Sequence, residues 1–147
     1  NDEIKAFYLD ERGEEIGMRD ARHANGARIL PKILQAVECA LVSSSMEEAE
    51  QMIEESVGND GDCRIGTSAA IGLFTAAAGD PIDTILGGAN IGGDTDTIAC
   101  IAGSLAGAYS GFSALPGDWY GTFKAANPDL DFEQIAAQLT ELASVRR

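Results

Sequence analysis

The chain has 147 residues, 45% of them hydrophobic, and 24 Asp and Glu against 10 Lys and Arg give it a formal net charge of −14 at pH 7. This length and apolar content suffice for one globular domain with a core. The acidity repels phosphate backbones and anionic membrane surfaces, so we expect no nucleic-acid partner and no membrane partner.

The first part of the chain changes from polar to periodic. Residues 1–26 are polar and mixed in charge, and we expect an irregular N-terminal segment there. From residue 28 to about 41, apolar residues recur every three or four positions, which predicts an amphipathic helix. A second helix is expected over about 46–57, with Ser45 as its N-cap.

Glycine and Asp punctuate the middle of the chain. Residues 58–66 are rich in Gly, Asn and Asp, which predicts a loop. We expect the next helix to begin at a Thr67 or Ser68 cap and to stop at Gly79. A short helix follows with Asp80 as its cap, and its predicted end is at the Gly87–Gly88 pair.

The last part of the chain predicts three more helices. A long one runs over about 95–110, a short helix and turn lie in 118–129, and an amphipathic helix covers 131–145. In the long helix, glycines at every fourth position would let neighbouring helices approach closely, which predicts a buried central helix; these are Gly103, Gly107 and Gly111. No segment alternates as a strand does, so the expected fold is all-α.

The three cysteines are widely spaced and form no zinc-binding pairs. We expect reduced thiols in a cytoplasmic protein. Cys39 and Cys100 sit among apolar helix positions and are predicted to lie in the core, whereas Cys63 falls in the predicted loop.

The start of the long helix carries the densest group of oxygen donors. Asp94, Asp96 and Thr97 follow a glycine-rich segment, and hard oxygen ligands suit Mg²⁺, Mn²⁺ or Ca²⁺. The alternative is that Asp94 only caps the helix and Asp96 only lies in its first turn. Spacing alone leaves both interpretations open.

The stretch "NIGGDTDTIACIAGSLAGAYSGFSALPGDWY" resembles the C-terminal signature of the ADP-ribosylglycohydrolase family, and the likeness extends more loosely over residues 56–120. The resemblance implies an all-α, compact helical bundle, of which residues 1–147 would be the C-terminal part. It also implies two Mg²⁺ or Mn²⁺ ions, with Asp94, Asp96 and Thr97 among their ligands and one Asp bridging the pair.

The same resemblance implies a substrate site. The backbone at Ile91, Gly92 and Gly93 would line the ribose side of the pocket, and Gly58 and Asn59 would help to hold the ADP-ribose. The implied reaction is hydrolysis at the anomeric carbon of an ADP-ribosyl group carried by a protein side chain or a small molecule.

The family's other metal-binding segment and its catalytic acidic residue belong to an N-terminal half, whose pattern these 147 residues do not contain. We therefore expect that half as a partner, cleaved or separate, and no activity from this chain alone. The alternative function is a non-catalytic relative of the same fold that acts as a binding or structural protein. The intact GGDTDT sequence favours the enzyme, because packing does not require all three ligands.

Overall fold

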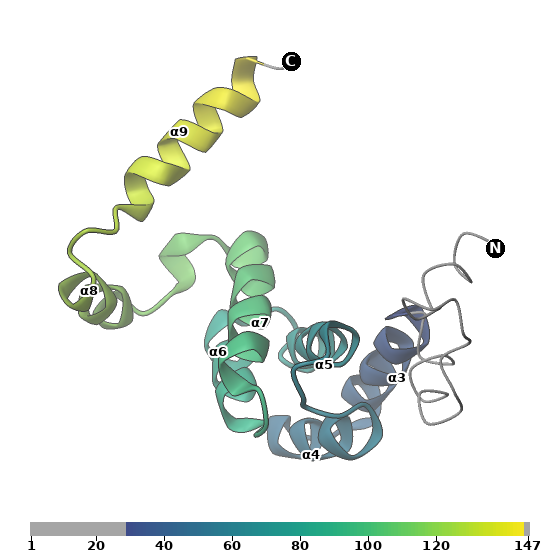
Figure 1. Cartoon of the computed structure of the whole chain (residues 1–147). Helices are drawn as coiled ribbons and strands as arrows, with labels where there is room; N and C mark the ends of the chain where they lie inside the picture. The colour runs from purple at the N-terminus through teal and green to yellow at the C-terminus, as the bar shows by residue number, and fades with distance from the viewer. Residues whose placement is uncertain (1–28, 146–147) are drawn as a thin grey trace, which may run out of the picture. The chain divides into compact units, whose positions relative to one another are not determined.

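A computed structural model describes residues 29–145 of the chain, so the prediction for residues 1–26 falls outside the described residues. Within that range there are seven α-helices, one short 3₁₀ helix and no strand, which confirms the all-α prediction (Figure 1). The helices are α3 (Ile29–Val42), α4 (Met46–Ser56), α5 (Cys63–Ala76), α6 (Pro81–Asn90), α7 (Thr95–Ser110), α8 (Gly117–Ala126) and α9 (Phe132–Val145), and the 3₁₀ helix η2 is Phe112–Ala114.

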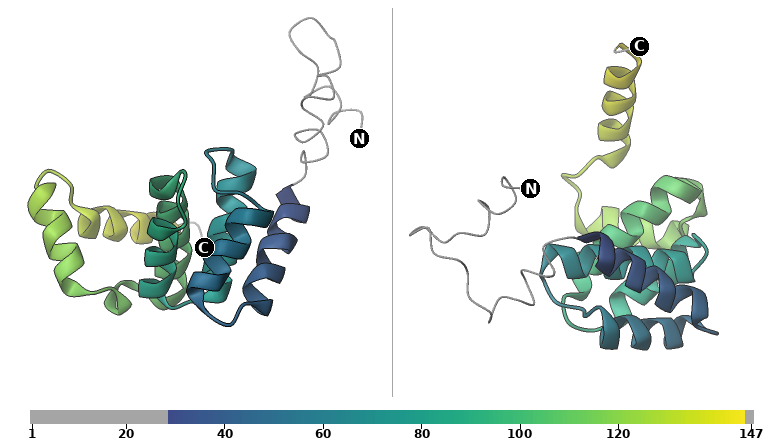
Figure 2. Two further views of the ribbon diagram at one scale, coloured as in Figure 1. Left: turned by 90° about the horizontal axis from the view of Figure 1, so that it is seen from below. Right: turned by 90° about the vertical axis from the view of Figure 1, so that its right-hand side faces the viewer.

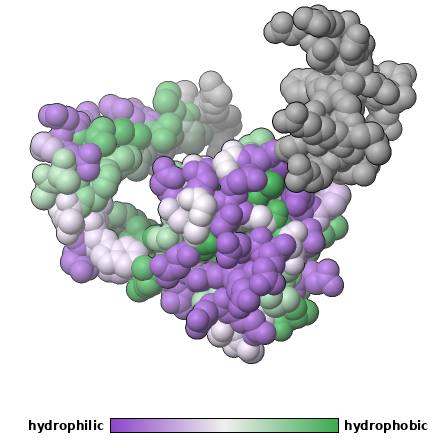
Figure 3. All heavy atoms as spheres, turned by 60° about the horizontal axis from the view of Figure 1, so that its bottom comes forward, coloured by the Kyte–Doolittle hydropathy of each residue, from purple (hydrophilic) through white to green (hydrophobic). Residues whose placement is uncertain are grey.

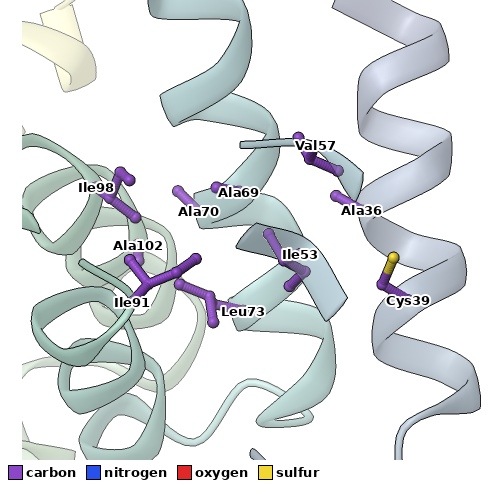
Figure 4. Packing of buried hydrophobic residues seen from close by; sticks show 10 residues of the cluster. All are labelled: Ala36, Cys39, Ile53, Val57, Ala69, Ala70, Leu73, Ile91, Ile98 and Ala102. Atoms are coloured by element: carbon purple, nitrogen blue, oxygen red, sulfur yellow. The ribbon is translucent and has the colours of Figure 1, made fainter. Parts of the chain in front are cut away.

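These helices fall into two compact units that divide between Ala114 and Leu115. In the first unit, α5 lies between α3 on one side and α6 with α7 on the other, and it packs against all four of its neighbours (Figures 1 and 2). The core gathers around α5, as Figure 4 shows. Its buried members are Ala36, Cys39, Ile53, Val57, Ala69, Ala70, Leu73, Ile91, Ile98 and Ala102.

The helix starts show where local signals were sufficient and where they were not. Ser45 and Asp80 cap α4 and α6 as predicted, each accepting a hydrogen bond from a backbone N–H of the first turn. The predicted start of α5 at Thr67 or Ser68 is wrong. The helix begins at Cys63 because the Asp62 side chain accepts from the N–H of Arg64 and caps it there.

Helix α6 does not break at its two glycines as predicted, but continues to Asn90. The reason is tertiary packing. A Cβ atom added at Gly88 would lie 2.6 Å from the Cα atom of Ala99 in α7, so the glycine allows the two helix backbones to touch. Gly87 is buried as well, beneath Met46 of α4.

Helix α7 has a buried face, as predicted, and Gly103 lies beside it, where a Cβ atom would be 3.1 Å from Cγ1 of Ile85 in α6. Its buried residues are Ile98, Ala102 and Ala106, at every fourth position. Within residues 29–145, a Cβ atom at Gly107 or Gly111 would meet nothing within 4 Å. The expected burial of Cys100 is also wrong, because Cys100 is exposed, whereas Cys39 is buried as predicted.

The second unit contains α8 and α9. The rings of Phe123 and Phe132 pack with their centroids 5.4 Å apart, and the Lys124 Nζ lies 3.8 Å from a carboxylate oxygen of Glu133. Asp131 accepts a hydrogen bond from the N–H of Gln134 and so caps α9 near its predicted start. The apolar face expected for α9 is present but exposed, with Leu139 and Leu142 each more than 60% accessible.

The charged run of α4 is a solvated surface. Glu47, Glu48, Glu54 and Glu55 are all exposed, and hydrophilic residues cover much of the nearer face in Figure 3. No helix within residues 29–145 is both long enough and apolar enough to cross a membrane.

Candidate functional site

Two loops of the first unit meet in front of α7. One joins α4 to α5 and contains Gly58 and Asn59, and the other joins α6 to α7 and contains Gly92 and Gly93. The backbone N–H of Asp94 donates a 2.8 Å hydrogen bond to the carbonyl oxygen of Asn59. The loop between α4 and α5, which lies well before the GGDTDT segment in the sequence, therefore contacts that segment in the fold.

The glycines of the second loop are required by its path. Gly92 and Gly93 have φ angles of 82° and 62°, in the left-handed region that favours glycine. A Cβ atom at Gly93 would lie 2.1 Å from the carbonyl oxygen of Asn59, which no side chain could tolerate. The close crossing of the two loops therefore depends on glycine at this position.

Ile91 contributes its side chain to the core and its carbonyl oxygen to the contact between the two loops. Its side chain is only 3% exposed and belongs to the core, while its carbonyl oxygen accepts a 3.0 Å hydrogen bond from Nδ2 of Asn59. Of the three residues expected to line a ribose pocket, Gly92 and Gly93 are the accessible ones. Gly58 has a φ of 104° and donates its N–H to the carbonyl oxygen of Ile53, so it turns the chain out of α4.

Asp94 occupies the N-cap position of α7 without acting as a cap. Its φ and ψ angles are −85° and 59°, and its side chain makes no capping hydrogen bond. The carboxylate is half-buried and faces the first loop, because a Cβ atom at Gly61 would lie 3.2 Å from its Oδ2 atom. The cap interpretation of Asp94 is therefore wrong, and its oxygens are directed elsewhere.

Asp96 and Thr97 lie in the exposed first turn of α7, beside Asp94. Their oxygens and the Asp94 carboxylate are hard donors of the kind that Mg²⁺ and Mn²⁺ prefer. Within residues 29–145, however, no group of three or more His, Cys, Asp or Glu side chains could hold a metal ion. The donors fit such a cation as part of a coordination shell and need further ligands to complete it.

Sequence reasoning missed two contributors to the site. Glu54 accepts a 3.2 Å hydrogen bond from Nδ2 of Asn59, and Gly61 leaves the space into which the Asp94 carboxylate extends. The Asn-Asp-Gly-Asp sequence did carry a usable signal, because Asp60 accepts from the N–H of Asp62 in a local Asx turn. That signal locates the turn but not its distant partner.

Comparison with known proteins adds to this geometry. The family model described as ADP-ribosylglycohydrolase matches residues 6–147. The uncharacterized protein YegU of Escherichia coli is 31% identical over 133 residues, which cover 86% of this chain and 40% of YegU. ADP-ribosylhydrolase ARH3 of Danio rerio is 59% identical over 29 residues, 20% of this chain and 8% of that protein.

The matched region therefore spans at most 40% of the length of these two curated relatives. No solved structure matches the chain.

Proposed function

The chain belongs to the ADP-ribosylglycohydrolase family, and we propose that it forms one side of an active site that hydrolyses an ADP-ribosyl glycosidic bond. One observation carries the proposal. The GGDTDT segment and the Asn59 loop are joined through the Asp94 amide, while the Asp94 carboxylate is left without a capping role. This carboxylate does not cap the helix and is not part of the buried core.

The role we propose for Asp94, Asp96 and Thr97 is to hold Mg²⁺ or Mn²⁺, with two ions in the complete site. When bound, such ions would polarise a water molecule and orient ribose hydroxyls. The contribution of this chain is to fix three oxygen donors at the start of one helix, which the buried side chains of Ile98 and Ala102 anchor in the core. Ligands fixed by packed support lose little freedom on binding.

The glycines would serve the substrate side of the site. Gly92 and Gly93 are accessible and carry no side chain, so a ribose can approach the backbone closely. The N–H groups at the start of α7 donate no hydrogen bond to the Asp94 side chain. They remain available to an oxygen of the ADP-ribosyl group. Gly58 and Asn59, in the loop between α4 and α5, would support the glycine loop on the side away from the ribose.

The remaining parts of the site would come from the portion of the family fold that lies outside the matched 40% of YegU. We propose that an N-terminal half, on the same or a separate polypeptide, supplies the other metal ligands and the general acid and base. The substrate would be an ADP-ribosylated protein or a small ADP-ribosyl compound.

The experiment that tests the proposal is hydrolysis of an ADP-ribosylated peptide by the protein with its completed fold, in the presence of Mg²⁺ or Mn²⁺. Asp94→Asn and Asp96→Asn are expected to lower the rate of ADP-ribose release by at least about 100-fold, the upper range seen even for outer-shell changes. Asp83→Asn is the matched control, because Asp83 is an exposed aspartate in the first turn of α6.

Full activity in both site variants would refute the proposed metal role. If the unaltered protein binds Mn²⁺ but releases no ADP-ribose from ADP-ribosylated arginine, serine or free nucleotide substrates, the non-catalytic alternative is correct. Mn²⁺ binding, measured by electron paramagnetic resonance of the free ion, separates these two outcomes.

A further inference from the structure

We propose that Asn59 is a positioning residue, which holds the loop before α7 so that the Asp94 carboxylate stays in place. The inference rests on the proposed role of Asp94 as a metal ligand. It differs from the role that the family resemblance implies for Asn59, which is to help to hold the ADP-ribose.

The first argument concerns the hydrogen-bonding capacity of the Asn59 side chain. A carboxamide nitrogen carries two N–H donors. Nδ2 of Asn59 lies 3.0 Å from the carbonyl oxygen of Ile91 and 3.2 Å from Oε1 of Glu54, and it donates to both. Both donors are therefore used within the protein, and neither is left for a substrate.

The second argument concerns where these bonds lead. Ile91 is fixed at the end of α6, because its N–H donates to the carbonyl oxygen of Gly87 and its side chain is buried in the core. A hydrogen bond from Asn59 to Ile91 consequently ties the first loop to the rigid end of α6. The exposed Glu54 holds the same amide from the α4 side.

The third argument concerns Asp94 itself. Its N–H donates to the main-chain oxygen of Asn59, and no capping hydrogen bond holds its side chain. This backbone hydrogen bond therefore fixes the position of the Asp94 main chain, from which the carboxylate extends. Because the Asn59 side chain fixes the Asn59 backbone relative to Ile91, losing that side chain would loosen the Asp94 end of the short segment from Ile91 to Asp94.

The test uses two measurements on the protein with its completed fold. Amide hydrogen exchange of Asp94, followed by NMR without added metal, reports the loop contact directly. In Asn59→Ala, its protection factor is expected to fall about tenfold, the equivalent of one net hydrogen bond to stability. The amide of Thr84, which donates to the carbonyl oxygen of Asp80, is the internal reference for a general loss of stability.

The second measurement is the dissociation constant for Mn²⁺ alone, expected to rise about 10- to 100-fold in Asn59→Ala, as for other residues that orient a metal ligand. Asp60→Asn is the matched control, because it alters the neighbouring exposed residue and keeps an oxygen that can accept from Asp62. Glu54→Ala removes only one of the two acceptors of Asn59, and a smaller effect is expected.

The variant N59D makes the contact with Ile91 depend on pH, and Glu54 is the titratable group that faces residue 59. The introduced carboxyl, when ionised, cannot donate to the carbonyl oxygen of Ile91, whereas its protonated form can. Protection of the Asp94 amide, corrected for the intrinsic exchange rate, is therefore expected to recover as the pH falls through the pKa of the introduced carboxyl.

Unchanged Asp94 protection and unchanged Mn²⁺ affinity in Asn59→Ala would overturn the inference. So would a variant that raises only the KM for substrate, because Asn59 would then be a substrate ligand. If Asp94→Asn itself leaves Mn²⁺ affinity intact, the proposed metal role fails, and with it the role of Asn59 toward that ligand. If Asp94→Asn weakens Mn²⁺ binding and Asn59→Ala does not, only the positioning role fails.

Discussion

Gly93 packs directly against the carbonyl oxygen of Asn59, and a Cβ atom at position 93 would lie 2.1 Å from that oxygen. Gly93→Ala is therefore expected to lower the free energy of unfolding by about 3 kcal/mol, from left-handed strain and overpacking together. Urea unfolding followed by circular dichroism measures this change. Gly92→Ala separates the two causes, because its Cβ would lie 3.2 Å from Nδ2 of Asn59 and it would add mainly strain. Equal costs for both variants would show that the crossing is unimportant.

The contact between α6 and α7 gives a second pair of glycine variants. A Cβ at Gly88 would lie 2.6 Å from the Cα of Ala99, so Gly88→Ala must separate the two backbones and is expected to cost about 1–3 kcal/mol of unfolding free energy. Within residues 29–145, a Cβ at Gly107 in α7 would meet no neighbour within 4 Å, so Gly107→Ala is expected to stabilise by up to about 1 kcal/mol through helix propensity. Thermal unfolding of both variants checks the pair, and a neutral Gly88→Ala would contradict the close approach.

The start of α4 is expected to give a pH-dependent stability. The N–H and Oγ of Ser44 both donate to Oε2 of Glu48, and these hydrogen bonds lower the pKa of that carboxyl below its usual value. A lowered folded-state pKa means that the stabilisation is present above the unfolded pKa and is lost as the pH falls through the folded one. Glu48→Ala is therefore expected to destabilise at pH 7 and to have little effect at pH 2.

The measurement is the midpoint of urea unfolding across this pH range. Glu55→Ala is the control, because Glu55 is an exposed glutamate of the same helix and accepts a hydrogen bond from the Gln51 side chain. A pH-independent cost for Glu48→Ala would mean that helix propensity, not the charged hydrogen bond, sets its effect.

The three thiols are expected to react at different rates. Cys63 and Cys100 are exposed, whereas Cys39 is 5% exposed and lies in the core between α3 and its neighbours. A thiol reagent applied to the folded chain should label two cysteines rapidly and the third only after denaturant is added. Peptide mapping identifies them, and rapid labelling of Cys39 would contradict the packing of α3.

Local chemistry explains what could be predicted from the sequence. Ser45 and Asp80 were identified as caps because a hydroxyl or carboxylate before a helix bonds to that helix alone. The start of α5 was missed because Gly61 and Gly66 suggested a loop. Gly66 instead lies buried inside the helix, where a Cβ would make ordinary contacts, 3.6 Å from the carbonyl oxygen of Asp60 and 3.7 Å from Cγ1 of Ile98. Its burial depends on the neighbouring helices, which composition does not show.

In the candidate site, too, local features could be predicted and contacts between distant segments could not. The oxygen donors of GGDTDT stand next to one another in the chain, so their grouping was predictable. Their connection to Asn59 was suggested only by family resemblance, and the hydrogen bonds that make it join loops distant in sequence. The exposed state of Cys100 was missed for a related reason, because α7 is rich in apolar residues all round and its buried face could not be chosen from periodicity.

The uncapped start of α7 also bears on how this protein would respond to engineering for heat resistance. Three other helices of the first unit begin with a side chain that bonds to the first turn, whereas the Asp94 side chain forgoes that bond. Selection for thermal tolerance alone should therefore favour changes that release residue 94 into a capping conformation. Under the proposed function, those gains would be made at the cost of turnover, so a stability screen should hold this position fixed.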